Sequence, residues 1–509
     1  MPWYKQAYDW VERRVQLEGF VKSSAEHRVP VKTASWWYVF GSAAFTLLIL
    51  QIVTGILLAL VYVPSAGEAW HSLQVLNHQL PLGWFLRGMH FWGSNFMVAV
   101  VLIHMTQVFL FGAYKFPREL TWLLGVGLLL MTLGMAFSGQ VLRFDQDAYW
   151  GLGIGASIMG RVPFIGGQLV HFVLGGPIIA GTTLTRFYAL HVFLLPATML
   201  GFASLHTWLV LTCGINEWPA PGRLVKRETY MQEYHELEKK GMPFVPGAVW
   251  KDAMFAAGIL FAVAVCAAIF GPYGPTGIPD PTIVQTVPKP DFFFLWIYTA
   301  LAFLPPSIET PVMLIAPIIG VGALVALPFI AGFGEKSWYR RPVGVLAVIV
   351  LAVSFAVLTQ LGTYTPWSPK MDAWSSDAVP IHFVHGTTPL ERQGALVLQS
   401  KQCRDCHQLG GIGGRRGPEL DNVATKLTED QIVRQVIQGG GNMPAYGKAL
   451  TPPQVTALVA FLETLHPANQ RPATDASRSI AESDRPAPHE PVEETPSLKQ
   501  LKPAPPAQP

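Results

Sequence analysis

The sequence predicts an all-α membrane protein in which seven transmembrane helices precede a small helical domain. Half of the 509 residues are apolar, and the charged share of 14% is far below the roughly 25% of soluble proteins. Seven long stretches contain no Asp, Glu, Lys or Arg. Beyond about residue 370 the composition becomes mixed and then proline-rich. These three observations predict a membrane bundle that continues into a domain outside the bilayer.

The composition also excludes several classes of protein. With 36 Lys and Arg against 33 Asp and Glu, the net charge of +3 lacks the basic field of a nucleic-acid-binding protein, so no nucleic acid partner is expected. Four cysteines are too few for a disulfide scaffold. The apolar share excludes a disordered or collagen-like chain despite 47 Gly and 42 Pro.

Each uncharged stretch can supply a transmembrane helix, which needs about 20 mostly apolar residues. A shorter stretch, Phe292–Ile308, is broken by two prolines, so we expect it to be interfacial or re-entrant. No cleavable signal peptide is expected, because the first 33 residues are rich in charge and the first apolar stretch is too long. The seven stretches are Ala34–Gly67, Gly88–Tyr114, Leu120–Leu142, Phe187–Asn216, Ala253–Pro279, Thr310–Gly334 and Pro342–Pro369.

Lys and Arg gather in alternate connections between these spans. They are frequent in the N-terminal segment and in the connections between spans two and three, four and five, and six and seven. The positive-inside rule places these connections on the inner side of the membrane. Since the number of spans is odd, the C-terminal region is then expected on the outer side.

The chain divides into seven predicted parts. The last part should be disordered, because residues 467–509 contain ten prolines and almost no large apolar residues. The parts are an amphipathic N-terminal segment (1–33), a four-helix domain (34–216), an inner-side linker (217–252), a three-helix domain (253–369), a second linker (370–387), the small helical domain (388–467) and the tail (468–509).

The small domain contains the C-x-x-C-H motif for covalent attachment of a c-type haem, formed by Cys403, Cys406 and His407. The two thiols add to the haem vinyl groups, and the histidine is placed to bind the iron. The alternatives are a chance match and a zinc half-site. A zinc site would need two further ligands at metal spacing, whereas Cys213 and Cys266 lie in or beside predicted spans.

The sixth ligand of this haem is predicted to be Met443. It lies in a glycine-rich segment before Pro444, a poor setting for a core methionine, which is the alternative. Met/His ligation raises the reduction potential and suits an electron carrier. Helices are predicted before and after the motif, over Pro389–Lys401 and Pro452–Leu465.

This C-terminal stretch resembles a class I cytochrome c. The resemblance implies that Pro418 buttresses the haem histidine. It also implies that Gly394 and Phe461 lie where the terminal helices cross.

Four histidines lie within two predicted spans, where ionisable residues are costly and usually functional. His90 and His104 are 14 residues apart in the second span, and His191 and His206 are 15 apart in the fourth. At about 100° and about 1.5 Å per residue, each pair lies near one helix face, about 21 Å apart. Both spans run inward, so His90 faces His191 near the outer surface and His104 faces His206 near the inner one.

The histidine pair at each level therefore predicts bis-histidine ligation of a b-type haem. Two stacked haems would carry electrons across the bilayer. A packing histidine is the alternative for any one residue. Glycines support the haem interpretation, because a flat macrocycle between helices requires close backbone approach. Gly41 and Gly55 are 14 apart in the first span, as are Gly125 and Gly139 in the third. Ordinary small-residue packing between membrane helices is the alternative.

Residues from about 20 to 365 resemble cytochrome b of the Rieske/cytochrome b quinol-oxidising complexes, of the bc and bf types. The specific stretches are Lys-Phe-Pro-Arg-Glu-Leu-Thr-Trp at 115–122 and Leu-Thr-Arg-Phe-Tyr-Ala-Leu-His at 184–191. The 15-residue step and seven spans are similar to the chloroplast and cyanobacterial type, where the last three helices form a separate subunit. The resemblance implies a four-helix dihaem bundle plus three helices, with Arg87 and Arg186 serving the outer haem through its propionates.

The same resemblance locates an outer quinol site at the end of the third span and before the short apolar stretch. The family's proline–tryptophan pair is replaced here by Arg143 and Phe144, and its Pro-Glu-Trp-Tyr motif by Pro290, Asp291 and two phenylalanines. A quinol site needs a proton acceptor at the edge of an apolar aromatic pocket, which Asp291 supplies. A capping aspartate after Pro290 is the alternative.

The sequence gives a weaker signal for an inner quinone site. Lys251 and Asp252 resemble the Lys-Asp pair of the mitochondrial and proteobacterial type, and a carboxylate there could protonate reduced quinone. An orientation-setting, snorkelling pair is the alternative. Val39 matches the position of the cysteine that attaches an extra haem in the chloroplast type, so no covalent extra haem is expected.

The main prediction is therefore a cytochrome b–c fusion subunit of a proton-translocating quinol:cytochrome c reductase. Quinol would give one electron to a separate Rieske iron–sulfur protein and onward to the c haem, and one across the two b haems to an inner quinone. The alternatives are a Rieske-independent relay from quinone to the c haem, and an assembly or sensor subunit without turnover. Family members are dimers, so a homodimeric multisubunit complex with a cytochrome acceptor is expected. The fusion, unlike the organelle forms, points to a bacterial cytoplasmic membrane with the c domain on the periplasmic side.

Overall fold

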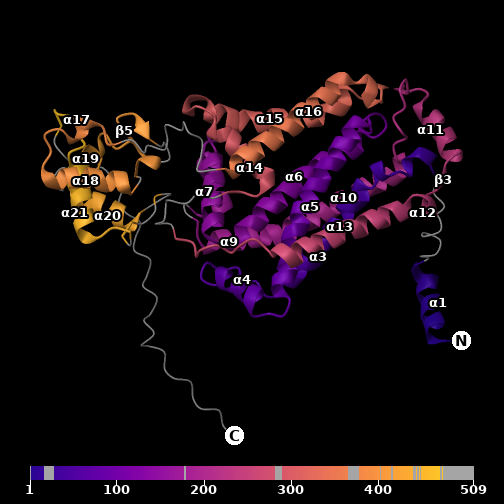
Figure 1. The fold of residues 1–509 in the computed structure, drawn as a ribbon, viewed down its shortest axis with the longest axis horizontal. Helices are drawn as coiled ribbons and strands as arrows, with labels where there is room; N and C mark the ends of the chain where they lie inside the picture. The colour runs from indigo at the N-terminus through magenta and orange to yellow at the C-terminus, as the bar shows by residue number, and fades with distance from the viewer. Residues whose placement is uncertain are drawn as a thin grey trace, which may run out of the picture. The chain divides into compact units, whose positions relative to one another are not determined.

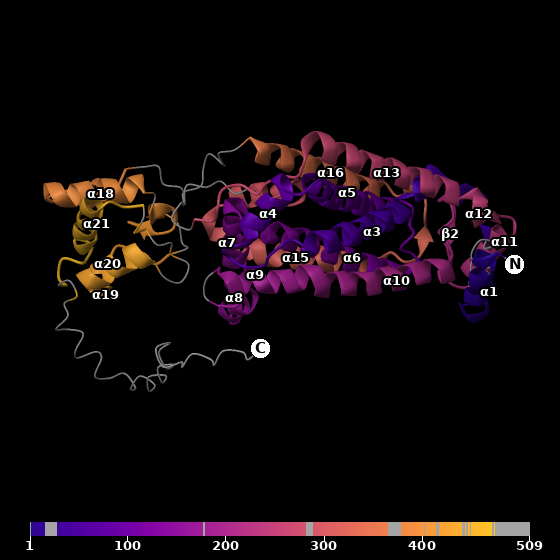
Figure 2. The ribbon, with the colours of Figure 1, turned by 90° about the horizontal axis from the view of Figure 1, so that it is seen from below.

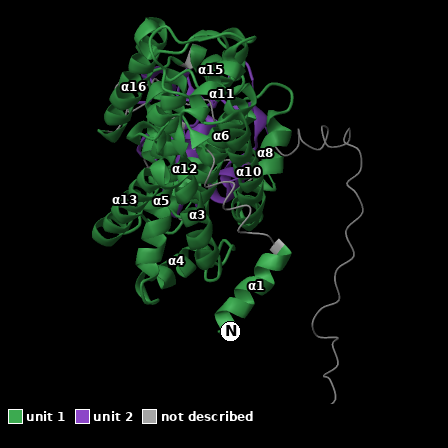
Figure 3. Ribbon diagram, turned by 90° about the vertical axis from the view of Figure 1, so that its right-hand side faces the viewer, with its two compact units in different colours: residues 1–375, 440–444 green, residues 376–439, 445–509 purple. Residues whose placement is uncertain are grey.

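The computed structural model describes residues 2–15, 28–176, 179–280, 289–364, 378–401, 403–413, 417–439, 443, 446–447, 449–470 and 473. The chain forms two compact units, one of residues 1–375 with 440–444 and one of residues 376–439 with 445–509 (Figure 3). Most of the tail predicted to be disordered, the last five residues of the predicted three-helix domain (365–369) and residues 370–377 of the second linker lie outside the described residues.

Among its described residues, the first unit has seven helices that are long and apolar enough to cross a membrane, as the sequence predicts. The prediction of an all-α, seven-helix bundle is therefore confirmed, and the protein is an integral membrane protein. The spans are α3 (Phe40–Ala59), α5 (Gly83–Leu110), α6 (Glu119–Leu142), α9 (Gly181–Ala189) continued through η3 (Leu190–Leu194) into α10 (Leu195–Cys213), α13 (Val249–Phe270), α15 (Pro306–Ile330) and α16 (Pro342–Thr363).

Helices α3, α5, α6 and α10 run side by side as the four-helix part of the bundle (Figures 1 and 2). Helix α5 packs against α3 and α13, and α6 packs against α10 and α15. Their shared core includes Leu47, Met97, Val100 and Met199. Lipid-facing surfaces stay apolar, as in Ile318 and Leu351, which are exposed in the isolated chain.

The fourth span is interrupted by one wide turn. Residues Leu190–Leu194 form a π-helix, in which the main-chain N–H of Leu195 bonds the carbonyl of Leu190. Pro196 explains the irregularity, because proline has no N–H to continue the normal ladder. A π-turn inserts about one extra residue into a helix. The 15-residue step from His191 to His206 is thereby brought close to the register of the 14-residue step in α5.

The end of the bundle with His90 and His191 is called the outer end below, following the predicted topology. It is closed by short helices between the spans. Phe292–Ala302 forms a separate helix of 11 residues, so this stretch does not span. The short helices are α4 (Ala69–His78), α7 (Gln146–Gly160), α8 (Gly166–Leu174) and α14 (Phe292–Ala302).

The opposite, inner end carries α1 and the connecting segments with their short strands. Strand β1 pairs antiparallel with β3, and β2 with β4. The elements are α1 (Trp3–Val15), β1 (Arg28–Val29), η1 (Val31–Thr33), η2 (Trp36–Tyr38), β2 (Leu224–Val225), α11 (Tyr230–Lys239), β3 (Met242–Pro243), α12 (Phe244–Gly247), β4 (Gly334–Glu335) and η4 (Trp338–Arg340).

The second unit is a small helical domain. Its first and last long helices, α18 (Pro389–Ser400) and α21 (Pro452–Glu463), pack against each other. An ideal Cβ at Gly394 would lie 2.6 Å from Cβ of Phe461, so the predicted crossing requires glycine. The other elements are α17 (Ile381–Val384), η5 (Cys403–Asp405), β5 (Gln408–Leu409), β6 (Ile412–Gly413), α19 (Val423–Lys426) and α20 (Glu429–Gln438).

Candidate functional site

The outer histidines face each other between two helices. His90 lies on α5 and His191 on the π-turn η3, and their ring centroids are 6.3 Å apart with planes inclined by 78°. When two imidazole nitrogens bind one metal ion from opposite sides, each at about 2 Å, the two nitrogens are about 4 Å apart. The centroid separation is compatible with such a shared ion, because each centroid lies behind its ligating nitrogen.

Glycines allow neighbouring backbones to approach these rings closely. An ideal Cβ at Gly139 would lie 2.8 Å from Cε1 of His191, and one at Gly55 would lie 3.3 Å from Cε1 of His90. A methyl group at Gly139 would therefore displace the ring. The predicted correspondence between glycines and histidines is present at this level.

At the inner level, the contact on the first span is as close as at the outer level, and the contact on the third span is looser. An ideal Cβ would lie 3.3 Å from Cε1 of His104 at Gly41, and 3.6 Å from Cε1 of His206 at Gly125. Nδ1 of His104 is buried without a hydrogen-bond partner among the described residues. Each predicted glycine thus faces the histidine of its own level.

A cavity of about 560 Å³ lies at the outer level and fits a large, flat, mostly apolar group. Its volume falls within the range of about 300–1,000 Å³ typical of cofactor sites. The part of the chain that the structure describes contains no group of three or more His, Cys, Asp or Glu that could hold a bare metal ion. Two imidazoles across an apolar cavity suit a haem, which brings its own four equatorial ligands. The cavity is lined by residues that include His90, His191, Gly55, Gly139, Tyr273 and Asp291.

Asp291 lies at the edge of this cavity and precedes α14 together with Pro290. It occupies the N-cap position of α14, but its side chain makes no capping hydrogen bond. The capping alternative therefore does not explain this carboxyl group. Burial raises the pKa of Asp291, and the nearby cation of Arg143 opposes that rise. The carboxyl group is thus set in an apolar environment where it can exchange a proton.

Arg143 reaches the same cavity from the end of α6 and is buried. Its guanidinium group lies 4.8 Å from the ring centroid of Tyr273, and its Nε is 3.4 Å from a carboxylate oxygen of Asp145. Asp145 itself is fully buried and accepts hydrogen bonds from the N–H groups of Ala148 and Thr276, at 2.8 and 2.9 Å. The charge of Arg143 is therefore balanced within the site.

Neither Asp145 nor Tyr273 was predicted from the sequence to belong to this site. A signal for Asp145 existed, because an aspartate directly before a helical pattern is a typical N-cap, and Asp145 caps α7. Tyr273 follows α13 and gave no local signal. Only the fold brings it to Arg143.

The two predicted propionate-binding arginines differ in position. Arg87 lines the cavity, is buried, and donates hydrogen bonds to Asn77 Oδ1 at 3.0 Å and to the carbonyl of Gly274 at 2.6 Å. Arg186 is exposed, and its guanidinium group bonds the carbonyl of Phe172. It does not line the cavity.

Asp252 lies near the inner end of α13 and is tied to the first span. Ser42 Oγ donates a hydrogen bond to its carboxylate at 2.8 Å, and Lys251 Nζ bonds the carbonyl of Ala34 at 2.5 Å. The two residues thus differ in their partners: Lys251 is anchored to main chain, whereas Asp252 is half-buried beside a hydroxyl.

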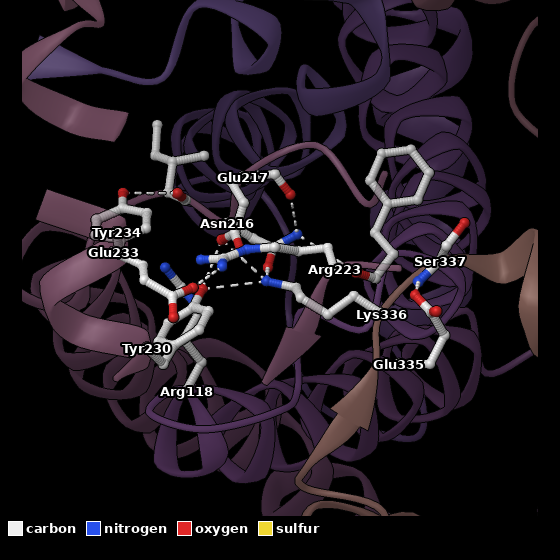
Figure 4. Close-up of polar contacts among 12 residues, drawn as sticks. Arg118, Asn216, Glu217, Arg223, Tyr230, Glu233, Tyr234, Glu335, Lys336 and Ser337 are labelled. Carbon is white, nitrogen blue, oxygen red and sulfur yellow. Dashed lines mark hydrogen bonds and ion pairs between the residues drawn. The ribbon is translucent and has the colours of Figure 1, made fainter. Parts of the chain in front are cut away.

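A buried ionic cluster at the inner end was not predicted from the sequence (Figure 4). Glu217 accepts bonds from Tyr230 OH at 2.5 Å and from Arg223 Nε at 3.1 Å, and its carboxylate lies 3.0 Å from Lys336 Nζ. Arg118 donates to Tyr230 OH at 2.7 Å. Burial opposes ionisation of Glu217, but Lys336, Tyr230 and Arg118 outweigh it and lower its pKa. The cluster joins the end of α10, the inner linker and the α15–α16 connection.

The C-x-x-C-H motif forms a short helical turn in the second unit. The N–H groups of Cys406 and His407 bond the carbonyl of Cys403, at 3.2 and 3.0 Å, so the three side chains leave one turn. Nδ1 of His407 is 2.7 Å from the carbonyl of Pro418, which leaves Nε2 available for a metal. This is the contact expected of a buttressed axial ligand.

Met443 is described by the structure, but its neighbours on both sides lie outside the described residues. Met443 as the sixth ligand stays a prediction.

The two units match different protein families. The model described as Cytochrome b/b6/petB matches residues 26–214, and the one described as Cytochrome C oxidase, cbb3-type, subunit III matches residues 389–462. The menaquinol:cytochrome c reductase cytochrome b subunit of Bacillus subtilis (strain 168) is 36% identical over 216 residues, covering 41% of this chain and 96% of that protein.

Two further similarities extend beyond the four-helix part. Cytochrome b of Rhodobacter capsulatus is 30% identical over 375 residues, covering 69% of this chain and 83% of that protein. A solved hyperthermophilic respiratory Complex III chain superposes with a TM-score of 0.60 at 27% identity, covering 70% of this chain and 91% of that chain. The chain therefore belongs to the cytochrome b family of complex III-type quinol oxidoreductases, with a cytochrome c domain fused after its membrane helices.

Proposed function

We propose that this chain oxidises quinol beside Asp291 and divides the two electrons between an external and a transmembrane path. His90 with His191, and His104 with His206, would hold two b-type haems. Cys403 and Cys406 would bond a c-type haem, with His407 and Met443 as axial ligands. When bound, the haems carry single electrons. The facing outer histidines, 6.3 Å apart beside an apolar cavity, carry this proposal.

Quinol oxidation releases two electrons and two protons, so the site needs a base. Ionised Asp291 would accept a proton from a quinol hydroxyl. Arg143 would stabilise the ionised carboxylate, because its cation lowers the pKa that burial raises. Phe293 is buried beside Phe292 and Phe294, at ring distances of 5.2 and 5.0 Å, and these rings help to keep water from the site.

The two electrons would leave in different directions. One would pass to a separate Rieske iron–sulfur protein, then to the c domain and on to a cytochrome acceptor. The other would pass from the outer to the inner histidine level. Two such electrons, from two turnovers, together with two protons taken up from the inner side, would reduce one quinone to quinol near Asp252. We propose a homodimeric complex in a bacterial cytoplasmic membrane, with the c domain on the periplasmic side. The assignment of a Rieske partner follows from family analogy.

Haem stoichiometry tests the ligand assignments. The complex purified in detergent should give a reduced pyridine haemochrome spectrum with two b haems and one c haem per chain. Fewer than two b haems would contradict ligation at one histidine level. An absent c haem would contradict the assignment of Cys403 and Cys406.

Co-purification tests the electron path separately. A Rieske protein should accompany the chain, and its removal should abolish cytochrome reduction by quinol. Full activity without it would favour the direct relay from quinone to the c haem. The replacement of the family's proline–tryptophan pair by Arg143 and Phe144 is compatible with such a relay.

A further inference from the structure

Both outer histidines are hydrogen-bonded to hydroxyl groups on neighbouring helices. Thr54 Oγ1 on α3 is 2.9 Å from Nδ1 of His90, and Ser138 Oγ on α6 is 2.9 Å from Nδ1 of His191. Thr54 and Ser138 are both buried. Each hydroxyl residue directly precedes the glycine that packs against the same ring, in the pairs Thr54-Gly55 and Ser138-Gly139.

The hydroxyl protons determine the direction of these bonds. Thr54 Oγ1 donates to the carbonyl of Leu50 at 2.7 Å, and Ser138 Oγ donates to the carbonyl of Gly134 at 2.7 Å. A hydroxyl group has only one proton. Each oxygen must therefore accept from the imidazole, so Nδ1 carries hydrogen and Nε2 presents its lone pair. Both outer rings are held in the metal-binding tautomer.

The inner level lacks this arrangement. No side-chain hydroxyl bonds Nδ1 of either inner histidine among the described residues. The fourth-span histidines both interact with main chain, His191 at Met135 and His206 at Thr121, so the levels differ in the hydroxyl contacts alone. The glycines of the inner level are preceded by apolar residues, in the pairs Phe40-Gly41 and Leu124-Gly125. The two levels thus share their backbone pattern and differ in the hydrogen bonding of their ligands.

We propose that Thr54 and Ser138 are positioning residues that make the outer haem a weaker electron acceptor than the inner haem. An Nδ1–H hydrogen bond increases the basicity of the ligating nitrogen and fixes the ring orientation. A more basic ligand stabilises ferric over ferrous iron and so lowers the reduction potential. Because both outer ligands have this bond, the electron is favoured to leave the outer level for the inner one. This inference rests on the bis-histidine ligation proposed above.

The test is a redox titration of the b haems in the intact complex. The variants are Thr54→Val, Ser138→Ala and the double variant. Thr46→Val and Thr198→Val are matched controls, because their hydroxyls bond only carbonyls, those of Ser42 at 2.9 Å and Leu194 at 2.8 Å. The double variant should raise the ferrous-to-ferric ratio of the outer haem about tenfold at fixed ambient potential, which equals about 59 mV for one electron. The inner haem and both controls should be unchanged.

Conservative variants separate this role from simple packing. Thr54→Ser and Ser138→Thr keep the acceptor oxygen and should keep the native potential. If Thr54→Val loses haem, Thr54→Ala removes the hydroxyl without filling the space and gives the potential instead. An unchanged outer potential in variants that retain both b haems would overturn the inference while leaving the ligation intact. A wild-type complex without an outer b haem would instead overturn the ligation itself.

Discussion

The outer and inner ends of the four-helix part differ although the same helices build both. Each end has one histidine from α5, one from the fourth span and glycines from α3 and α6. The outer end has hydroxyl acceptors, a cavity of about 560 Å³ and the half-buried Asp291. The inner end is joined by ion pairs around Glu217 and Lys336. A repeated backbone pattern thus places a histidine pair at each level, and the residues beside each pair would set how the proposed haem there reacts.

Histidine substitutions should separate the two levels most completely. His191→Leu should remove the outer b haem alone, and His206→Leu the inner b haem alone, because each loses one axial ligand. Haemochrome analysis should show the b-to-c ratio falling from two to one in both variants. Loss of both b haems from either variant would mean that the levels do not assemble independently.

Asp291→Asn should affect chemistry only at the outer end. An amide cannot accept the quinol proton, so quinol-dependent cytochrome reduction should fall about 10²- to 10⁴-fold. Haem content should not change, and Asp291→Glu should recover part of the rate. Near-normal activity in the Asn variant would assign the proton to another acceptor.

Lys336→Met should destabilise the inner end of the bundle and leave the outer end unchanged. The substitution removes one of the two cations that contact the buried Glu217. Breaking a buried ion pair costs about 3–5 kcal/mol when the remaining charge is left uncompensated, and we expect a smaller loss here because Arg223 still contacts Glu217 at 3.1 Å. Thermal unfolding in detergent should show the loss, and Glu217→Gln in the same background should recover much of it. Lys240→Met removes an exposed cation from the inner linker that also contains Glu217, and it should leave the melting temperature unchanged.

Substituting alanine for Gly139 or Gly125 should show how closely the backbone must approach the histidine at each level. Gly139→Ala should reduce occupancy of the outer haem, because the new Cβ would lie 2.8 Å from the ring of His191. Gly125→Ala should be tolerated, since its Cβ would lie 3.6 Å from the ring of His206, an ordinary van der Waals distance. The b-haem content of the two variants provides the comparison. Equal losses would favour general helix packing.

Arg143→Gln should produce the smallest effect, a shift in pH dependence. The cation of Arg143 lowers the pKa of Asp291, so its removal lets burial raise that pKa further. A base is active above its pKa, and the rate should therefore begin to fall at a higher pH on acidification. Initial rates across the acid range measure the shift, with Arg161→Gln as a control that removes a cation paired with Glu309 at 3.5 Å. A shift toward lower pH would contradict the electrostatic role of Arg143.

Much of the fold and site could be predicted from local patterns in the sequence. Uncharged stretches of membrane length identified the spans, since charge is costly in lipid. Histidine and glycine spacing identified the two levels, because a helix repeats at a fixed angle and rise. The C-x-x-C-H motif needed only adjacent residues. The hydroxyl residues before Gly55 and Gly139 were not predicted to matter, because their bonds to histidine appear only in the folded chain.

Contacts between segments far apart in the sequence are seen only in the folded chain. Tyr273 meets Arg143 across more than a hundred residues, and Lys336 meets Glu217 from the α15–α16 connection. The tertiary structure also showed that a π-turn before Pro196 reconciles the 15- and 14-residue steps, which simple helical geometry could not do. The membrane spans and the side chains proposed to bind haem iron could thus be predicted from sequence alone, because these depend on composition, helical period and a local motif. Charge pairing, burial and hydrogen-bond direction depend on which helices pack together, and only the folded chain determines them.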